Sequence, residues 1–300
     1  MPEPGEAGGV LASRAGTRYN HSMNPWISLP APAPDFPGTL YRFDPFPSAH
    51  VPPRRVDFWL PAGYDPANRY PVLYMHDGQN LFNPAESYTK ITWGVAETLT
   101  ALGIDCIVAG VWNAGPRRVT EYLPEAPFAG AHFDPLREEM RAQAGEAPCS
   151  EAYLRFLVEE LKPWADANLP TLPGPAHTAV MGSSMGGLIS LYALCRYPQV
   201  FGLAGCLSTH FPIGAGQIEE WMRDHLPQPG NHRLYFDYGG RGIDREYGVH
   251  HLRVRGFLDA LGWREGSDYL IRRFPSAAHN ERAWRKRLHV PLRFLFPEKR

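Results

Sequence analysis

Residues 177–198, HTAVMGSSMGGLISLYALCRYP, join a run of apolar β-type residues to a helical pattern, with two serines set among glycines between them. A strand, a tight turn and a helix in this order match the motif G-x-S-x-G, whose middle residue is Ser184. We therefore expect Ser184 to be a nucleophile held above the edge of a sheet. Gly182 and Gly186 are expected to leave room for the strained backbone of such a turn. Ser183 lacks the flanking spacing and is not favoured.

The backbone around this serine also predicts where negative charge could be stabilised. A helix that starts directly after Ser184 points its free N–H groups and its positive dipole end toward the nucleophile. The N–H of Met185 is therefore the first expected oxyanion donor. A second donor is expected in YMHDGQNLF (residues 74–82), where Gly78 permits a turn that aims the N–H of Gln79 inward.

A serine hydroxyl needs a base to take its proton, and in this kind of motif the acid and then the histidine follow the serine along the chain. His279 lies in FPSAAHNERAW (residues 274–284), between the last predicted strand and the last predicted helix, and is the predicted base. His250 and His251 fall inside a helical pattern and are interpreted as ordinary solvated or half-buried side chains. His210 is the second choice, and it could instead line the pocket.

The acid should leave the strand RLYFDYG (residues 233–239) and reach the ring nitrogen of His279 that faces away from the serine. Asp237 lies within this predicted strand. Asp244 follows the glycine-rich turn GGRGID, from which a side chain can swing toward the histidine. We predict Asp244, and Asp237 and Glu246 stay as alternatives.

Short apolar runs alternate with longer helical patterns over most of the chain. The strands are predicted in residues 39–43, 54–61, 70–77, 106–112, 177–184, 201–208, 233–239 and 268–276, and the helices in 93–103, 150–169, from 185, and in 217–224, 248–262 and 280–288. This alternation predicts one α/β domain with a mostly parallel sheet covered by helices on both faces. We assign it to residues 39–300 and interpret the Pro-, Gly- and Ala-rich residues 1–38 as a poorly ordered or wrapping arm. Residues 113–149 are long for a plain connection and are expected to shape the substrate site.

Composition argues against several classes of partner. The chain has 30 Lys and Arg against 31 Asp and Glu, so no basic field is expected to hold nucleic acid. Residues 1–22 contain no apolar run of the length of a signal sequence, and no apolar run elsewhere approaches the length of a membrane span, which predicts a cytoplasmic protein without a membrane partner. The sequence leaves open the oligomeric state and whether the chain starts at Met1 or at Met23.

Metal and cofactor chemistry has no candidate ligand set. His76 and Asp77 are neighbours, but no further ligands at suitable spacing join them, so we expect no metal and no cofactor. The chain has four scattered cysteines: Cys106, Cys149, Cys195 and Cys206. We expect them to be reduced and structural.

Taken together, these motifs resemble the putative-esterase family of α/β-hydrolases, which includes enterochelin esterases, feruloyl esterases, mycolyltransferases and S-formylglutathione hydrolases. The resemblance extends over about residues 55–295 and rests on residues 74–82, 108–124, 180–193, 234–244 and 274–288. It implies the α/β-hydrolase fold, with Gln79 giving an oxyanion amide and Ser184 as the elbow serine. It also matches His279, followed by a short helix that bears Trp284, to the terminal histidine of the family.

Two groups of side chains near the site follow from this resemblance and from position. The first is expected to be a structural cluster with an ion pair that orders a loop: Asn113, Arg118, Glu121 and Tyr122. The second is expected near the pocket mouth and would suit a moderately bulky acyl or alcohol group: Trp93, Trp112, Tyr122 and Phe211.

The predicted activity is hydrolysis of a small-molecule carboxylic ester. Ser184 would form an acyl-enzyme, His279 would activate water for deacylation, and Asp244 would orient the histidine. A thioesterase or an acyltransferase would use the same residues with a different leaving group or acceptor. A non-catalytic binding protein on the same scaffold is the rival from another class, and the intact set of serine, histidine, acid and glycines argues against it.

Overall fold

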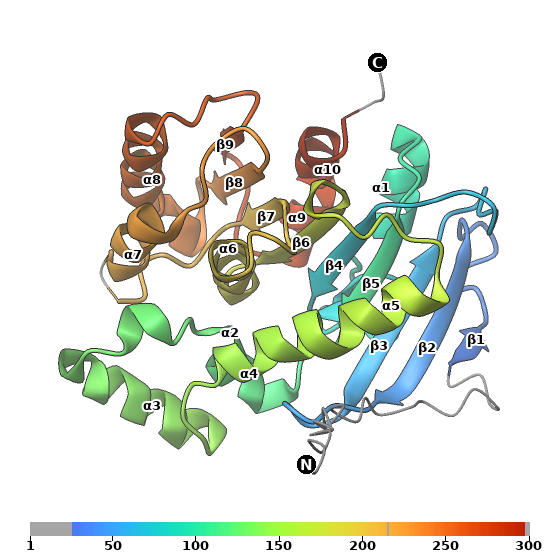
Figure 1. The fold of residues 1–300 in the computed structure, drawn as a ribbon, viewed down its shortest axis with the longest axis horizontal. Coiled ribbons are helices and arrows are strands. Elements are labelled where there is room, and N and C mark those ends of the chain that lie inside the picture. Colours follow the sequence, from blue (N-terminus) through green and yellow to red (C-terminus); the bar gives the residue numbers. More distant parts are fainter. Residues whose placement is uncertain (1–25, 215, 298–300) are drawn as a thin grey trace, which may run out of the picture.

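The computed structural model describes residues 26–214 and 216–297, in which one nine-stranded sheet is covered by helices on both faces (Figure 1). The strands are β1 (Ile27–Leu29), β2 (Thr39–Phe46), β3 (Arg54–Leu60), β4 (Val72–His76), β5 (Ile107–Val111), β6 (Thr178–Ser183), β7 (Leu203–Leu207), β8 (Arg233–Gly239) and β9 (Tyr269–Phe274). Their order across the sheet is β1-β2-β3-β5-β4-β6-β7-β8-β9. Pairings from β1 to β5 are antiparallel, and all pairings from β5 to β9 are parallel. The predicted α/β fold with a mostly parallel sheet is confirmed.

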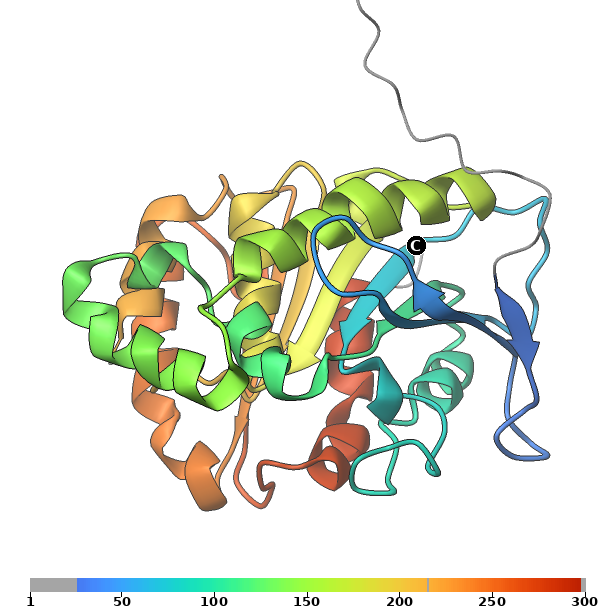
Figure 2. The same cartoon turned by 90° about the horizontal axis from the view of Figure 1, so that it is seen from below.

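The helices divide into two layers. They are α1 (Val95–Leu102), α2 (Arg118–Tyr122), α3 (Asp134–Ala144), α4 (Ser150–Arg155), α5 (Lys162–Asn168), α6 (Met185–Arg196), α7 (Gln217–His225), α8 (Gly248–Ala260), α9 (Glu281–Arg287) and α10 (His289–Leu295). Figure 2 shows α4 and α5 on one side of the sheet and α1, α9 and α10 on the other.

The alternation of side chains along each strand explains why both faces of the sheet are covered by apolar core. In β4, Tyr74 packs into the core that includes residues of α4 to α6, and the next residue, Met75, packs into the core that includes α1, α9 and α10. Successive side chains of a strand point to opposite faces, so a strand buried on both faces reads as a continuous apolar run. This is why β4 and β6 could be predicted from sequence.

The parallel strands place several loops at one edge of the sheet. β4, β6, β7, β8 and β9 run in the same direction. The loops after their carboxyl ends therefore carry Gln79, Ser184, His210, Asp244 and His279 to the same edge.

Three connections differ from the simple expectation. The predicted helix over residues 150–169 consists of α4, a π-helical segment (Phe156–Leu161) and α5. Pro163 stands at the start of α5 and cannot donate the usual backbone hydrogen bond, which fits the irregular helix before it. Residues 113–149 contain α2 and α3 rather than a plain loop, and a further helix, α10, follows the predicted last one.

The amino-terminal region contributes a short edge strand. β1 pairs with β2, with Ile27 opposite Arg42, so part of the predicted arm 1–38 joins the sheet. Residues 1–25 lie outside the described residues, and the domain division at residue 38 stays a prediction. Within residues 26–214 and 216–297, no helix is both long enough and apolar enough to cross a bilayer.

Candidate active site

Ser184 occupies a strained turn between β6 and α6. Its φ of 58° and ψ of −121° are unusual for a residue with a side chain, and the serine is half-buried. Its N–H donates to the Leu207 carbonyl at 2.9 Å, and its own carbonyl accepts from Gly187 and Leu188 at 3.0 and 3.2 Å. These bonds hold the turn on one side to the end of β7 and on the other to the first turn of α6. Ser183, by contrast, is 4% exposed at the end of β6.

The two motif glycines have different roles in this turn. A Cβ at Gly182 would lie 2.9 Å from the carbonyl carbon and oxygen of Gly186, a distance that a side chain cannot tolerate against backbone. A Cβ at Gly186 would have its nearest neighbours, Asp77 Oδ2 and His76 Cβ, at 3.6 Å, which is an ordinary contact. Space therefore requires glycine at position 182 and not at position 186.

The loop after β4 lies against the start of α6. Asp77 adopts a left-handed conformation with φ 57°, and Gly78 approaches the backbone so closely that a Cβ there would lie 2.5 Å from Gly110. Gln79 follows as the second residue of a short 3₁₀ helix (Gly78–Asn80). The first N–H groups of a helix have no intrahelical acceptor, and this holds for both Gln79 and Met185.

Side chains from the next connection hold this loop. Arg118 donates from Nε and NH2 to the two carboxylate oxygens of Asp77 at 2.7 and 2.8 Å, and Asn113 Nδ2 donates to Oδ1 at 2.7 Å. Burial alone would raise the pKa of Asp77, but the charge and hydrogen bonds of Arg118 outweigh it, so the pKa is lowered. Arg118 therefore forms an ion pair that orders a loop, as expected, and its partner is Asp77, which the sequence did not identify.

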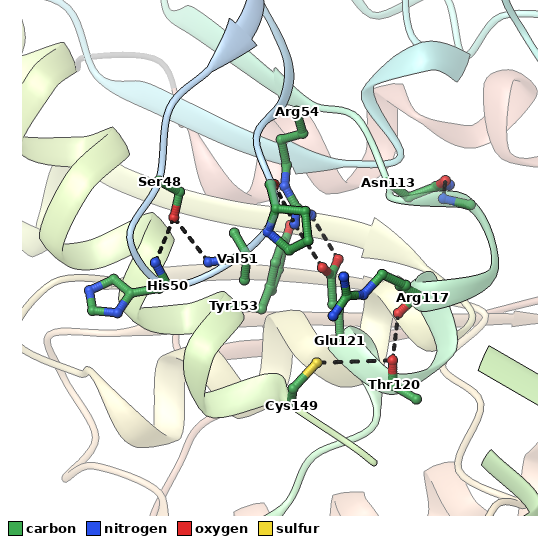
Figure 3. Close-up of polar contacts among 12 residues, drawn as sticks. Ser48, His50, Val51, Arg54, Asn113, Arg117, Thr120, Glu121, Cys149 and Tyr153 are labelled. Carbon is green, nitrogen blue, oxygen red and sulfur yellow. Dashed lines mark hydrogen bonds and ion pairs between the residues drawn. The ribbon is translucent and has the colours of Figure 1, made fainter. Parts of the chain in front are cut away.

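Glu121 belongs to a separate buried pair. It accepts from NH1 and NH2 of Arg54, each at 2.7 Å, and Figure 3 shows the two side chains facing each other near Tyr153. The Tyr153 hydroxyl lies 2.8 Å from Nδ1 of His76. Burial lowers the pKa of His76 to about 3, so this ring is neutral and structural at physiological pH.

The structure brings His279 and Asp244 together. Nδ1 of His279 lies 2.5 Å from Oδ1 of Asp244, and Oδ2 of the fully buried carboxylate accepts from the Gly239 N–H at 2.7 Å and from Ser208 Oγ at 2.6 Å. Burial would raise the pKa of Asp244, but hydrogen bonds from His279 and Ser208 outweigh it and the pKa is lowered. Asp244 is therefore an ionised carboxylate next to the imidazole.

The two alternative acids lie elsewhere. Asp237, inside β8 as predicted, accepts from Arg287 Nε and NH2 at 3.0 and 2.8 Å and from the Tyr235 hydroxyl at 3.0 Å. Glu246 is exposed. Neither carboxylate has a hydrogen bond to His279 in the described part of the chain.

Ser208 and Arg287 were not identified from the sequence. Ser208 Oγ accepts from Trp284 Nε1 at 3.0 Å and from Arg287 NH2 at 2.7 Å, and it donates to Asp244. The Ser208 N–H donates to Asp237 Oδ1 at 3.0 Å. A serine at a strand end and an arginine in a basic run carry no distinctive sequence signal, so only the fold reveals this network behind Asp244.

His210 lies beside these groups. The backbone N–H of His210 donates to the Ser184 carbonyl at 3.3 Å, and the ring Nδ1 lies 2.6 Å from the Tyr247 hydroxyl. The pKa of His210 is lowered mainly by burial and, to a smaller extent, by the nearby His279. His250 pairs with buried Glu219 at 2.6 Å, and His251 is buried with Nδ1 2.8 Å from the Tyr247 carbonyl.

The expectation of an aromatic pocket mouth is wrong for three of its four residues. Trp93 is 3% exposed, and Tyr122 and Phe211 are fully buried, so they belong to the core. Trp112 is half-buried and donates from Nε1 to Asp57 at 2.9 Å. Large aromatic side chains stabilise a core as readily as they line a pocket, which is why sequence alone misplaced them.

The parts of the site are joined through backbone and side chains. Ser184 bonds to Leu207, the next residue Ser208 bonds to Asp244, and Asp244 bonds to His279. Among the described residues, no hydrogen bond joins Ser184 Oγ directly to the His279 ring. Catalytic hydrogen bonds are often long without substrate, so the arrangement can support base-assisted attack by the serine.

A parallel sheet with a strained serine between strand and helix, and a histidine–carboxylate pair at the same edge, defines the α/β-hydrolase fold. The chain belongs to the putative esterase family, which matches residues 52–295.

Sequence relatives cover only parts of the chain. It is 30% identical over 146 residues to the uncharacterized protein YjcH of Bacillus subtilis (strain 168), a match that covers 48% of this chain and 50% of YjcH. It is 37% identical over 81 residues to an iron(III) enterobactin esterase of Dickeya dadantii (strain 3937), which covers 27% of this chain and 18% of that protein. The chain thus spans half the length of YjcH and far less of the enterobactin esterase.

Solved structures share the fold more completely. An IroE-like serine hydrolase from Shewanella oneidensis has a TM-score of 0.62 at 21% identity, over 86% of this chain and 79% of that one. A mutant feruloyl esterase module from Clostridium thermocellum, complexed with sinapinate, also has a TM-score of 0.62, at 17% identity over 91% and 96%. At these identities the likeness shows the fold alone.

Proposed function

We propose that this protein is a serine esterase that cleaves a small-molecule carboxylic ester through an acyl-enzyme on Ser184. His279 is the general base and acid, and Asp244 orients it. The observation that carries this proposal is the strained Ser184 at the start of α6, at the same sheet edge as the half-buried His279 and its buried partner Asp244. Strain of this kind persists where the surrounding structure imposes it, most often at functional sites.

The hydrogen bond between His279 Nδ1 and Asp244 leaves Nε2 as the proton acceptor. Ser184 Oγ attacks the ester carbonyl carbon while its proton moves to Nε2. The carbon–oxygen bond to the alcohol then breaks, and His279 returns the proton to the leaving oxygen. Water repeats the sequence on the acyl-enzyme, giving the carboxylic acid and restoring Ser184.

Two backbone N–H groups are proposed to bind the oxyanion of each tetrahedral intermediate. Met185 contributes from the start of α6, and Gln79 from the loop held by Asp77 and Arg118. One such donor contributes about 3 kcal/mol to lowering the barrier. Because Arg118 fixes Asp77 in its left-handed conformation, it is proposed to position the Gln79 donor.

The proposal is tested by steady-state hydrolysis with the wild type and two serine variants. The substrates are p-nitrophenyl esters, feruloyl and acetyl-sugar esters, acyl thioesters and triscatecholate siderophore esters. We expect one ester class to be preferred and Ser184→Ala to lower its kcat by at least about 10⁴-fold. Ser183→Ala, a neighbouring and more buried serine, is the matched control and should retain most activity.

Other results would favour the alternatives. Preference for a thioester, or transfer to an added alcohol in place of hydrolysis, would identify a thioesterase or an acyltransferase with the same residues. Equal slowness toward every substrate, with no difference between wild type and Ser184→Ala, would contradict the enzyme and favour a binding protein.

A further inference from the structure

The carboxyl-terminal part of the chain is strongly basic although the whole chain is nearly neutral. Residues 269–297 contain seven Lys and Arg and one acidic residue, Glu281, whereas the formal net charge of the chain is −1. The seven cations are Arg272, Arg273, Arg282, Arg285, Lys286, Arg287 and Arg293. The net charge therefore conceals a local basic region on and around α9.

Two grooves run along α9 and share the same cationic side chains. One has a volume of about 460 Å³ and is bounded by α9 and residues 274–278, the segment that leads to His279. The other has a volume of about 510 Å³ and is bounded by α9 and α1. Arg282, Lys286 and His289 line both grooves. Arg282 and Lys286 lie four residues apart on one face of α9, and His289 is the first residue of α10. These three side chains form a basic ridge that borders both grooves.

The side chains of this ridge are unpaired in the described part of the chain. Arg282, Lys286 and His289 are exposed, and within residues 26–214 and 216–297 none of them has an ion pair or a hydrogen bond. Of the residues that the structure describes, Glu97 is the only acidic one that lines either groove, and it lies 3.5 Å from Arg285. Cations near one another without counter-charges create a positive potential that attracts anions.

A buried cation supplies an independent observation. Arg287 lines the groove beside residues 274–278, yet it is only 2% exposed. Its Nε and NH2 are used by Asp237 and Ser208, but NH1 is buried without a hydrogen-bond partner. A buried N–H donor without an acceptor is costly, so a hydrogen-bond acceptor that reached this nitrogen would be favoured.

We propose that the groove between α9 and residues 274–278 binds a small molecule through a phosphate group. Arg282, Lys286 and His289 face the anion from the ridge, and Arg287 lies at the base of the groove. The volume of about 460 Å³ suits a small ligand. Two cations without counter-charge, Arg282 and Lys286, suit a multiply charged oxyanion better than a single carboxylate. A ligand with a second phosphate group can cross the ridge into the groove beside α1.

The test is isothermal titration calorimetry, which measures the affinity of the full-length protein for inorganic pyrophosphate as the probe. We expect one binding site, and affinity at least about 100-fold weaker in the double variant Arg282→Glu/Lys286→Glu, because two charge-assisted contacts become repulsive. The control Arg69→Glu/Arg155→Glu makes the same change of charge at two exposed positions, of which Arg155 lies in α4 on the other side of the sheet from α9, and should leave the affinity unchanged. Circular dichroism checks that each variant is folded.

Three outcomes would overturn the proposal. They are no binding of pyrophosphate by the wild type, equal weakening in the control variant, and binding of a single-stranded oligonucleotide without any binding of pyrophosphate. None of these outcomes depends on esterase activity, so this site and the proposed function can fail separately.

Discussion

Ser208 Oγ lies 2.6 Å from Oδ2 of Asp244, whose other carboxylate oxygen faces His279. The serine hydroxyl has one proton to donate and can accept two hydrogen bonds. It accepts from Trp284 Nε1 and from Arg287 NH2, so its proton is directed to Asp244. Ser208 therefore holds the proposed catalytic acid from the side opposite to the histidine bond.

Removing this hydroxyl should impair catalysis more than folding. We expect Ser208→Ala to lower kcat roughly 10-fold with little change in KM, because a hydrogen bond to a charged group contributes about 1.5 kcal/mol or more. Ser150→Ala, at another fully buried serine, is the control and should leave kcat unchanged. An identical effect of both variants would reduce Ser208 to a packing role.

The choice among the three carboxylates can be decided by isosteric amides. Asp244→Asn should lower kcat by roughly 10⁴-fold, because the amide favours the wrong tautomer of His279. Asp237→Asn should mainly lower the free energy of unfolding, since it breaks a buried ion pair with Arg287. Glu246→Gln, at an exposed position, should change neither. Steady-state kinetics and urea denaturation measure both effects, and a large kcat loss in Glu246→Gln would show that the acid is misassigned.

The two glycines of the turn should respond differently to alanine. Gly182→Ala brings a methyl group to 2.9 Å from the Gly186 backbone and should abolish activity or folding. At Gly186 the added methyl group has nothing closer than 3.6 Å, so Gly186→Ala should fold and stay active. Thermal melts and ester hydrolysis compare the two directly. Equal tolerance of both substitutions would mean that the backbone of the turn is not as close as the structure has it.

Stability should decrease as the solution is acidified below neutral pH. Burial lowers the pKa of His76 to about 3 and that of His251 to about 4, whereas an unfolded histidine titrates near 6.5. Between about pH 6.5 and 5 the unfolded state therefore binds protons that the folded state does not, and folding is disfavoured by up to about 1.4 kcal/mol per pH unit for each histidine. Urea denaturation at several pH values measures this slope. His251→Asn should make it shallower, and a free energy of unfolding that rises on acidification would contradict the assignment.

The sequence predicted the parts of the molecule that depend on local pattern. Continuous apolar runs identified strands such as β4 because both faces of that strand are buried. The turn at Ser184 was identified because strand, glycine and helix signals coincide within ten residues of the chain. His279 followed from its place after the last strand.

Contacts between distant segments could not be predicted in this way. Arg287 stands in a basic run typical of an exposed helix, yet it is buried and pairs with Asp237, a residue 50 positions earlier. Phe211 was expected at a pocket mouth, but its side chain is fully buried in the hydrophobic core. The basic character of α9 is a local feature, and a formal net charge of −1 averages it out over the whole chain.

Labelling with a fluorophosphonate probe tests the central claim most directly, because the probe reacts only with an activated serine. Mass spectrometry of the digested wild type is predicted to find one adduct, on Ser184, that persists in Ser183→Ala and disappears in Ser184→Ala. Wild-type protein that is labelled no more than Ser184→Ala, or an adduct on a different serine, would contradict the account.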